Sequence, residues 1–353
     1  MGDWKKNLRV VDPYVPGEQP KQENMIKLNT NENPYPPAPG VEKVLKSMET
    51  GDFHLYPKPD ARELVDALAA EYNVPADQVF VGVGSDDVLG MAFLTCFNGE
   101  KPILFPDITY SFYPVWADLF KIPYNRPALD ENFCIKKEDY FTENGGIVIA
   151  NPNAPTSIAM PLADIEEIIA KNPDSVVIID EAYVDFGGES DLPLVDKYEN
   201  LLVVQTFSKS RSMAGMRIGF AIGSKALIDA MYAVRNSYNS YTMNMPSILC
   251  GVEAVEDYDY FEKTRTAIMA TRDEVKKKME ALGFNVLPSS ANFLFAAHES
   301  VPAEELFLML REKHIYVRYF KQPRIQNYLR ITIGTPEQMN KFLEEVEKYL
   351  ATK

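Results

Sequence analysis

One segment decides the fold, Thr206-Phe-Ser-Lys-Ser-Arg-Ser-Met-Ala-Gly-Met-Arg-Ile-Gly219. An apolar run precedes it at residues 201–205, and a second apolar run occupies residues 218–222 at its far end. Short apolar runs of this kind are typical of strands that are buried on both faces. Lys209 is therefore expected in a connection between two core strands, which is where α/β folds place their chemistry.

The hydroxyl residues around Lys209 indicate a phosphate-bearing partner. A lysine amine can form an imine with an aldehyde when desolvation or nearby cations favour its neutral form. Thr206, Ser208 and Arg217 could hold a phosphate, the arginine through a charge-assisted bidentate pair. The alternative is a solvated loop lysine, since most lysines are exposed.

From residue 51 onward, short apolar runs alternate with helical patterns. The runs cover residues 79–82, 103–105, 146–150, 176–179, 202–204 and 218–222. Between them lie amphipathic segments such as residues 60–72, where Leu64, Leu68 and Tyr72 share one face. This alternation predicts an α/β fold, with a large domain whose mostly parallel sheet is covered by helices on both sides.

The pattern changes past residue 247, where helices become longer, with one strand expected at residues 291–296 and another at residues 328–333. A capping box at Thr335-Pro-Glu-Gln338 opens the last helix, with a buried stripe of apolar residues. The stripe comprises Met339, Phe342, Leu343, Val346 and Leu350. Residues up to about 40 are proline-rich and predict an extended arm. We expect an arm with part of the small domain at residues 1–42, the large domain at 43–246 and a smaller α+β domain at 247–353.

Composition limits the partners. The 51 acidic and 36 basic residues give a formal charge of −15, which would repel nucleic acid and anionic membrane surfaces. Three scattered cysteines and three scattered histidines give no disulfide framework and no metal-ligand spacing, so no metal is expected. The N-terminus lacks the apolar core of a signal peptide, and no run approaches a membrane span. A cytoplasmic protein is expected.

An anion site is predicted at Val83-Gly-Ser-Asp-Asp87, which follows a strand and opens an apolar helix at residues 88–97. Flexible glycine backbone and a Ser85 cap would meet the positive end of that helix. The alternative is a plain turn with a good cap.

Three further strand ends carry candidate residues. Asp180 ends a buried strand, and a carboxylate there is costly unless it is paired. With Lys209 nearby, it could keep a pyridinium nitrogen protonated, while Tyr183 could bond the hydroxyl of the same ring. Tyr110 follows another strand and could stack on a planar ring, although most tyrosines merely pack. The turn-rich run Asn151-Pro-Asn-Ala-Pro-Thr-Ser157 is by itself only a loop.

The order of these features resembles the fold-type I aminotransferases that use pyridoxal 5′-phosphate, and the resemblance covers nearly the whole chain. Within that family, five further motifs resemble the histidinol-phosphate aminotransferases. They are Pro13-Tyr-Val-Pro-Gly17, Lys27-Leu-Asn-Thr-Asn-Glu-Asn-Pro34, Tyr56-Pro-Lys-Pro59, Ser290-Ala-Asn-Phe293 and Tyr328-Leu-Arg-Ile-Thr-Ile-Gly334. Enzymes acting on aromatic amino acids share much of this set.

The resemblance implies roles at the cofactor ring. Lys209 would form the covalent imine, Asp180 would face the pyridine nitrogen and Tyr183 would bond the phenolic oxygen. Tyr110 would stack on the ring.

The resemblance also implies a phosphate site and a substrate site. The phosphate would be held by the backbone at Ser85 and Asp86 and by the side chains of Thr206, Ser208 and Arg217. Tyr56 would reach the same phosphate from the neighbouring subunit of a homodimer. Arg318 and Arg330, helped by Tyr14, would meet the anionic end of the substrate, although each arginine could be a solvated edge charge.

The chain departs from the family pattern at three places. The family has asparagine before Pro-Thr and glycine after it, where this chain has Ala154 and Ser157. Either Asn153 would replace the missing hydrogen bond to the phenolic oxygen, or Tyr183 would act alone. Arg211 makes the segment after the lysine more polar and could change what lines the entrance.

The resemblance implies a pyridoxal-phosphate-dependent transaminase that converts histidinol phosphate and 2-oxoglutarate in histidine biosynthesis. The alternatives are an aromatic amino-acid aminotransferase, a decarboxylase of the same fold acting on threonine phosphate, and a non-enzymatic binding or regulatory module.

Overall fold

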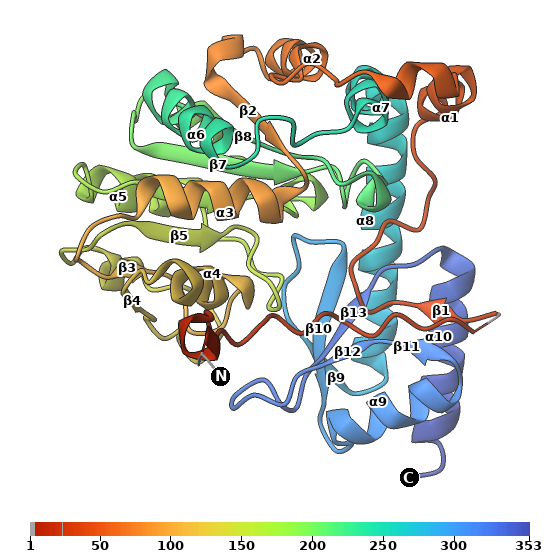
Figure 1. Ribbon diagram of the computed structural model, residues 1–353. Helices are drawn as coiled ribbons and strands as arrows, with labels where there is room; N and C mark the ends of the chain where they lie inside the picture. The colour runs from red at the N-terminus through yellow and green to blue at the C-terminus, as the bar shows by residue number, and fades with distance from the viewer. Residues whose placement is uncertain (1–3, 23) are drawn as a thin grey trace.

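Two main sheets organise the chain, of which the computed structural model describes residues 4–22 and 24–353 (Figure 1). Within the described residues, the larger sheet has seven strands in the order β2-β8-β7-β6-β5-β3-β4. They are β2 (Val79–Gly82), β3 (Ile103–Leu104), β4 (Tyr124–Asn125), β5 (Ile147–Ala150), β6 (Val177–Asp180), β7 (Leu201–Thr206) and β8 (Gly219–Gly223). β8 runs antiparallel to both of its neighbours, and the other neighbouring pairs are parallel. The expected mostly parallel sheet is confirmed.

Both faces of this sheet are covered. Alternate residues of each strand point to opposite sides and therefore pack into different cores. Val177 and Ile179 of β6 pack into one hydrophobic core, and Ile178 between them packs into another. The first core includes α2 (Arg62–Tyr72), α5 (Leu162–Lys171) and α7 (Met245–Glu256), and the second includes α3 (Ser85–Cys96), α4 (Phe112–Phe120) and α6 (Lys225–Tyr238). Burial on both faces explains the continuous apolar runs in the sequence.

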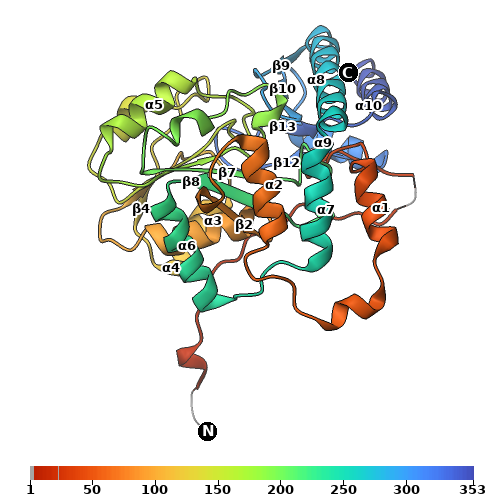
Figure 2. The same cartoon turned by 90° about the horizontal axis from the view of Figure 1, so that it is seen from above.

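A smaller antiparallel sheet forms the second half of the molecule. Its order is β12-β13-β10-β9, and three helices pack on it (Figures 1 and 2). Its elements are α8 (Tyr258–Ala281), β9 (Phe284–Val286), β10 (Phe293–His298), α9 (Ala303–Glu312), β12 (Arg318–Tyr319), β13 (Leu329–Thr332) and α10 (Pro336–Leu350). α10 begins with the expected capping box, in which the Gln338 N–H donates to Thr335 Oγ1 at 3.3 Å and the Thr335 N–H donates to Gln338 Oε1 at 2.9 Å.

The N-terminal arm crosses from the large domain to the small one (Figure 1). Its strand β1 (Ile26–Lys27) pairs in parallel with β11 (Ile315–Tyr316). The arm ends at α1 (Pro39–Ser47), where proline occupies the first helical turn and its missing N–H costs nothing. The arm is thereby tied to the small domain before the chain enters the large one.

α7 lies at the expected boundary at residue 247. A Cβ added to Gly251 of α7 would lie 2.9 Å from Leu64 Cδ1 of α2, so α7 packs closely on the large-sheet core. The proposed domain limits therefore stay a prediction.

Short 3₁₀ helices complete the chain: η1 (Trp4–Asn7), η2 (Thr50–His54), η3 (Ala76–Gln78), η4 (Lys137–Tyr140), η5 (Val184–Phe186), η6 (Leu192–Leu194) and η7 (Ala214–Met216). Over residues 4–22 and 24–353, no helix combines the length and apolar character needed to cross a bilayer.

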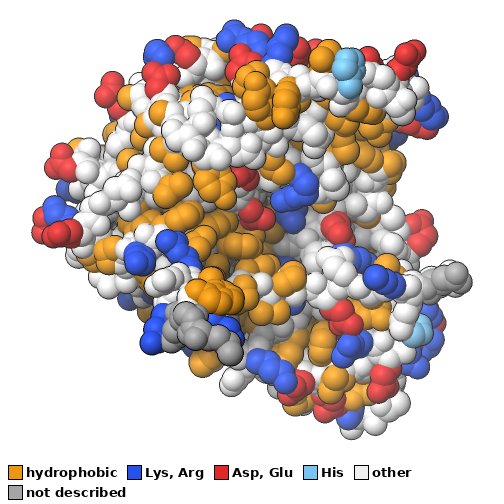
Figure 3. All heavy atoms as spheres, viewed as in Figure 1, with side chains coloured by type: hydrophobic (Ala, Val, Ile, Leu, Met, Phe, Trp, Pro, Cys, Tyr) orange, Lys and Arg blue, Asp and Glu red, His pale blue; other side chains and the backbone are white. Residues whose placement is uncertain are grey.

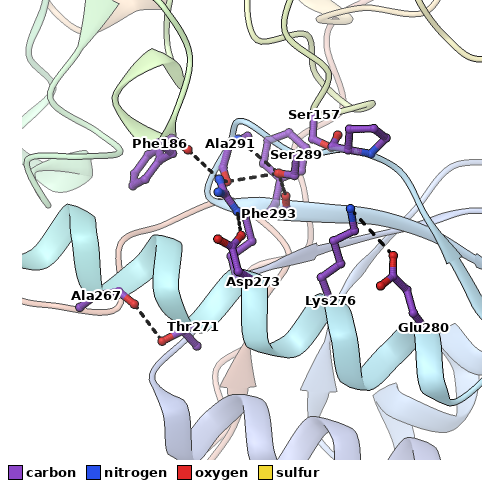
Figure 4. Close-up of polar contacts among 12 residues, drawn as sticks. Ser157, Phe186, Ala267, Thr271, Asp273, Lys276, Glu280, Ser289, Ala291 and Phe293 are labelled. Carbon is purple, nitrogen blue, oxygen red and sulfur yellow. Dashed lines mark hydrogen bonds and ion pairs between the residues drawn. The ribbon is translucent and has the colours of Figure 1, made fainter.

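Ser157 links the two halves of the molecule. It adopts the left-handed backbone conformation (φ 67°) that suits the glycine of the family pattern. Its carbonyl accepts from the Ser290 N–H at 2.9 Å, and its hydroxyl donates to the Pro288 carbonyl at 3.0 Å. Figure 4 shows Ser157 beside the loop that carries Ser289 and Ala291. The serine therefore gains contacts that a glycine would lack.

Arg272 of α8 holds the same loop from the other side. Its Nη1 donates to the Phe186 carbonyl at 2.6 Å and to the Ala291 carbonyl at 3.0 Å. Phe186 follows β6, whereas Ala291 precedes β10. One buried guanidinium thus connects the strand ends of both sheets.

We expect Ser157→Ala to lower the free energy of unfolding by about 1 kcal/mol, because alanine loses the hydroxyl bond and keeps the left-handed strain. Ser157→Gly should cost less, since glycine loses the bond but relieves the strain. Urea denaturation of the two variants measures the difference. An alanine variant as stable as the glycine variant would contradict this account.

Candidate active site

A cavity of about 220 Å³ lies between the two sheets, at the carboxyl ends of the central strands β5, β6 and β7. Charged side chains of both signs gather between the halves of the molecule in Figure 3. The predicted residues that line the cavity are Tyr14, Ser85, Asp86, Tyr110, Asp180, Tyr183, Thr206, Ser208, Lys209, Arg217, Arg318 and Arg330. Residues from the arm, the large domain and the small sheet therefore meet in one place.

Lys209 follows β7, and its position is set by the arm. Its Nζ donates to the Thr30 carbonyl at 3.2 Å and lies 5.7 Å from the centre of the Tyr183 ring. The amide of Asn33 donates to the carbonyls of Lys209 and Ser210, at 2.9 and 3.2 Å. The amine thus faces the cavity from a backbone that the arm holds.

Asp180 ends β6 and is 5% exposed. Tyr113 donates its hydroxyl proton to Oδ2 at 2.8 Å, and the Ala182 N–H donates to Oδ1 at 3.2 Å. Burial nevertheless raises the pKa of the Asp180 carboxyl to about 6, because desolvation outweighs these bonds. A positive group in the cavity would be the natural partner of this carboxylate.

Tyr183 lies three residues beyond Asp180, in the turn after β6. Its hydroxyl oxygen accepts a hydrogen bond from the Asn31 amide at 2.9 Å. Its ring meets the edge of Phe293, with centroids 5.1 Å apart and planes at 85°. The hydroxyl is thus held at the wall of the cavity while its own proton stays available.

The start of α3 is where an anion site is expected, but it lacks the expected cap. Ser85 is the first residue of the helix, and Gly84 precedes it with φ 84°; no side chain of the described residues caps this end. A Cβ on Gly84 would lie 2.4 Å from Arg217 Nη2, so only glycine leaves room for the guanidinium. Ser208 Oγ accepts from Arg217 Nη1 at 3.3 Å and from Thr206 Oγ1 at 3.0 Å. Uncapped N–H groups, two hydroxyls and a guanidinium therefore converge on one spot.

Tyr110 lies beside this spot. Its hydroxyl donates to Asp86 Oδ1 at 2.8 Å, and Asp86 Oδ2 is 3.7 Å from Arg217 Nη2. Burial and the Asp86 carboxylate hold the pKa of the Tyr110 hydroxyl well above its ordinary value. Tyr110 therefore remains a neutral donor at physiological pH.

The small sheet contributes two guanidinium groups, those of Arg318 and Arg330. Both face the ring of Phe320, at 5.5 and 5.6 Å, so they lie near each other. Among the described residues, no carboxylate pairs with either arginine, and Arg330 Nε is buried without a partner. Burial lowers the pKa of the Arg330 guanidinium, and the nearby Arg318 adds to this effect. Two unpaired cations in a partly buried cleft favour an anionic ligand.

Two predicted residues lie outside the cavity. Asn153 donates to the Ile108 carbonyl at 3.0 Å and to Thr156 Oγ1 at 2.9 Å, so its amide is committed elsewhere. Tyr56 is 78% exposed and stacks on Tyr241, with centroids 4.5 Å apart.

Arg211, which could have changed what lines the entrance, does not line the cavity. Its side chain is buried beneath the loop, donates to the Ala254 carbonyl at 2.6 Å and stacks on Phe261 at 4.5 Å. The charge of Arg211 is therefore satisfied inside the large domain, where Nη2 also lies 3.5 Å from Glu71 Oε1.

Sequence reasoning missed the arm residues and Tyr113. Thr30 and Asn31 line the cavity, and Asn33 fixes the lysine loop. Their density of asparagine within residues 29–33 was the available signal, but only the fold reveals what they contact. Tyr113 gave no signal, since it lies inside an apolar helical stretch.

The residues present fit pyridoxal 5′-phosphate, the cofactor that the resemblance implies. A primary amine, a buried carboxylate and a phenolic hydroxyl line the same cavity. The glycine cradle at Gly84 and the Arg217 guanidinium offer a site for a phosphate dianion at the helix start.

Comparisons with known proteins agree with this chemistry. The family model described as "Aminotransferase class I and II" matches residues 23–346. A histidinol-phosphate aminotransferase of Lactococcus lactis subsp. cremoris is 51% identical over 350 residues, covering 99% of this chain and 98% of that protein. Histidinol-phosphate aminotransferase 1 of Hydrogenovibrio crunogenus is 50% identical over 349 residues, covering 99% and 98%. The structure of the Sinorhizobium meliloti histidinol-phosphate aminotransferase in complex with pyridoxal-5′-phosphate superposes with a TM-score of 0.84 at 20% identity, covering 93% and 91%.

The buried carboxylate gives a prediction for the cofactor-free protein. The folded-state pKa of Asp180, about 6, lies above the ordinary value of 3.8, so folding favours its protonated form. That contribution is complete below pH 3.8 and is lost as the pH rises through 6. We expect Asp180→Asn to match the native protein in stability at pH 4 and to exceed it at pH 8 by up to about 3 kcal/mol.

Urea denaturation at the two pH values tests this, and other titrating groups cancel in the comparison. An equal difference at both pH values would show that the carboxylate is not strained by burial.

Proposed function

Because the chain belongs to the class I and II aminotransferase family, we propose that it transfers the amino group of histidinol phosphate to 2-oxoglutarate. The products are imidazole acetol phosphate and glutamate, and the reaction belongs to histidine biosynthesis. The cofactor is pyridoxal 5′-phosphate. One structural observation carries the proposal: two guanidinium groups without carboxylate partners among the described residues share a cavity with Lys209 and Asp180.

When bound, the cofactor supplies an electrophilic carbon and an electron-withdrawing ring. Lys209 would act as the base that removes a proton from the substrate carbon. It would then act as the acid that returns this proton to the C4′ carbon of the cofactor. Asp180 would hold a negative charge beside the ring nitrogen and keep it protonated, and Tyr183 would donate a hydrogen bond to the phenolic oxygen. Arg217 and the start of α3 bind the phosphate, since their donors are already oriented.

Arg318 and Arg330 bind the far end of the substrate. A phosphate dianion would satisfy both guanidinium groups, whereas the single carboxylate of phenylalanine would leave more positive charge uncompensated. Tyr14 lies at the same wall and stacks on Phe112, with centroids 4.5 Å apart. The pair of arginines therefore favours histidinol phosphate over an aromatic amino acid.

We expect histidinol phosphate to exceed phenylalanine in kcat/KM by at least about 100-fold, as two charge-assisted contacts would give. A steady-state comparison with 2-oxoglutarate as acceptor measures this ratio, and carbon dioxide release from threonine phosphate tests the decarboxylase alternative. Lys209→Ala is the control and should lose on the order of 10³-fold or more in kcat. Preference for phenylalanine, or an active Lys209→Ala variant, would defeat the proposal.

We also propose that the enzyme works as a cytoplasmic homodimer with shared sites. Exposed apolar side chains lie on the N-terminal segment, near η2 and at the end of α6, and Figure 2 places these segments on one side of the molecule. They include Trp4 (64% exposed), Leu55 (64%), Tyr56 (78%) and Tyr238 (76%). A second copy of the chain would cover this face and bring Tyr56 to the partner's phosphate site.

Tyr56→Phe should weaken cofactor affinity by about 2- to 12-fold, the range of one hydrogen bond, without changing the oligomeric state. Cofactor titration of the apoprotein and sedimentation velocity provide the two measurements. The matched control is Tyr241→Phe, which keeps the ring stack and removes a hydroxyl not assigned to the phosphate. A monomeric native protein, or unchanged affinity in Tyr56→Phe, would refute the shared site.

A further inference from the structure

We propose that Asn31 is a positioning residue for Tyr183, and that it compensates for the amide that the chain lacks at Ala154. Resting on the proposed function, this inference concerns how the protein controls the phenolic oxygen of its cofactor. Asn31 would direct the proton of the Tyr183 hydroxyl into the cavity.

A compensating hydrogen-bond donor is needed because the loop after β5 has no donor at the position where the family has asparagine. Ala154 lines the cavity with a methyl group and packs against Phe293 and Tyr183. The neighbouring amide of Asn153 donates to the Ile108 carbonyl and to Thr156 Oγ1, and its oxygen accepts from Thr109 Oγ1 at 2.8 Å. All of its hydrogen-bonding groups are therefore occupied on the far side of the loop.

Asn31 is held from several directions. It is 1% exposed, and its backbone N–H donates to Thr332 Oγ1 at 3.0 Å. Its carbonyl accepts from the Asn292 amide at 3.0 Å, and its Oδ1 accepts from Thr332 Oγ1 at 3.0 Å. The remaining group, Nδ2, is thereby aimed at the Tyr183 oxygen, 2.9 Å away.

This geometry decides which way the tyrosine proton points. An amide nitrogen can only donate, so the Tyr183 oxygen is the acceptor in the bond with Asn31. Its single proton is then left for an acceptor in the cavity, where the phenolic oxygen of the cofactor is expected. One donor held in a fixed direction compensates for the second donor that Ala154 cannot supply.

The backbone of Asn31 also fits this role. Its φ of 56° lies in the left-handed region, which asparagine tolerates better than most residues. Glycine would keep this conformation and both main-chain bonds while deleting the amide. Asn31→Gly therefore separates the side chain's contribution from the folding of the arm.

The test uses Asn31→Asp, which keeps the shape but replaces the donor by an acceptor. The Tyr183 proton would then turn toward the new carboxylate and away from the cavity. We expect cofactor affinity of the apoprotein to fall by about 2- to 12-fold. The midpoint pH of the bound cofactor's absorbance should rise, because a lost donor leaves more negative charge on the phenolic oxygen.

A double-mutant cycle with Tyr183→Phe distinguishes positioning from general stability. If Asn31 acts through the hydroxyl, Asn31→Asp has no further effect on the midpoint once that hydroxyl is gone. Asn29→Asp is the matched control, since it adds the same charge on the same segment and its amide bonds to the Glu18 carbonyl instead. Its effect should persist undiminished in the Tyr183→Phe background.

Asn31→Gly removes the donor without adding a charge and should raise the midpoint less than Asn31→Asp does. Additive effects of Asn31→Asp and Tyr183→Phe would overturn the inference, as would an unchanged midpoint in Asn31→Asp. Thermal melting of each apoprotein checks that the arm remains folded. A native apoprotein that binds no pyridoxal 5′-phosphate would instead refute the proposed function, so the two failures are distinguishable.

Discussion

A carboxylate buried at the end of a central strand is the constraint on which the site depends. Asp180 closes β6 between β5 and β7, where register places it beside Ala150 and Val204. The apolar strands that make the sheet stable also make this charge costly, and two hydrogen bonds do not offset that cost. Positive side chains surround this carboxylate. The cavity is lined by Lys209, Arg217, Arg318 and Arg330, although the formal charge of the whole chain is −15. Local arginines and lysine thus overcome a field that would otherwise repel phosphate.

The arm between residues 29 and 33 positions these separate groups relative to one another. The Asn29 carbonyl accepts from Arg330 at 3.1 Å, and the Thr30 carbonyl accepts from Lys209. Asn31 reaches Tyr183, and Asn33 holds the lysine loop. The arm itself is fixed to the small domain through β1 and β11. Backbone carbonyls and asparagine side chains of a single short segment therefore position groups from both sheets.

The departures from the family pattern have structural reasons. Ser157 occupies a left-handed position suited to glycine, and its hydroxyl contacts the loop before β10. Arg211 is buried between aromatic rings and a helix carbonyl, away from the entrance. Ala154 packs against Phe293 and Tyr183, and we propose that the Asn31–Tyr183 pair makes up for the hydrogen bond that its side chain cannot supply. Each substitution is accommodated by partners that are distant in sequence.

The sequence by itself determined the layered fold, because the spacing of apolar residues along the chain distinguishes buried strands from amphipathic helices. It also located Lys209, Asp180 and Tyr183 at strand ends, since the carboxyl edge of a parallel sheet collects such residues. It could not show that Ser85 begins a helix without capping it, that Asn153 turns away from the cavity, or that Tyr113 supports Asp180. Only the tertiary structure decided these points, because a side chain's hydrogen-bond partner depends on which distant backbone lies within about 3 Å of it. The pairing of Asn31 with Tyr183 spans most of the large domain in sequence, and no local pattern encodes it.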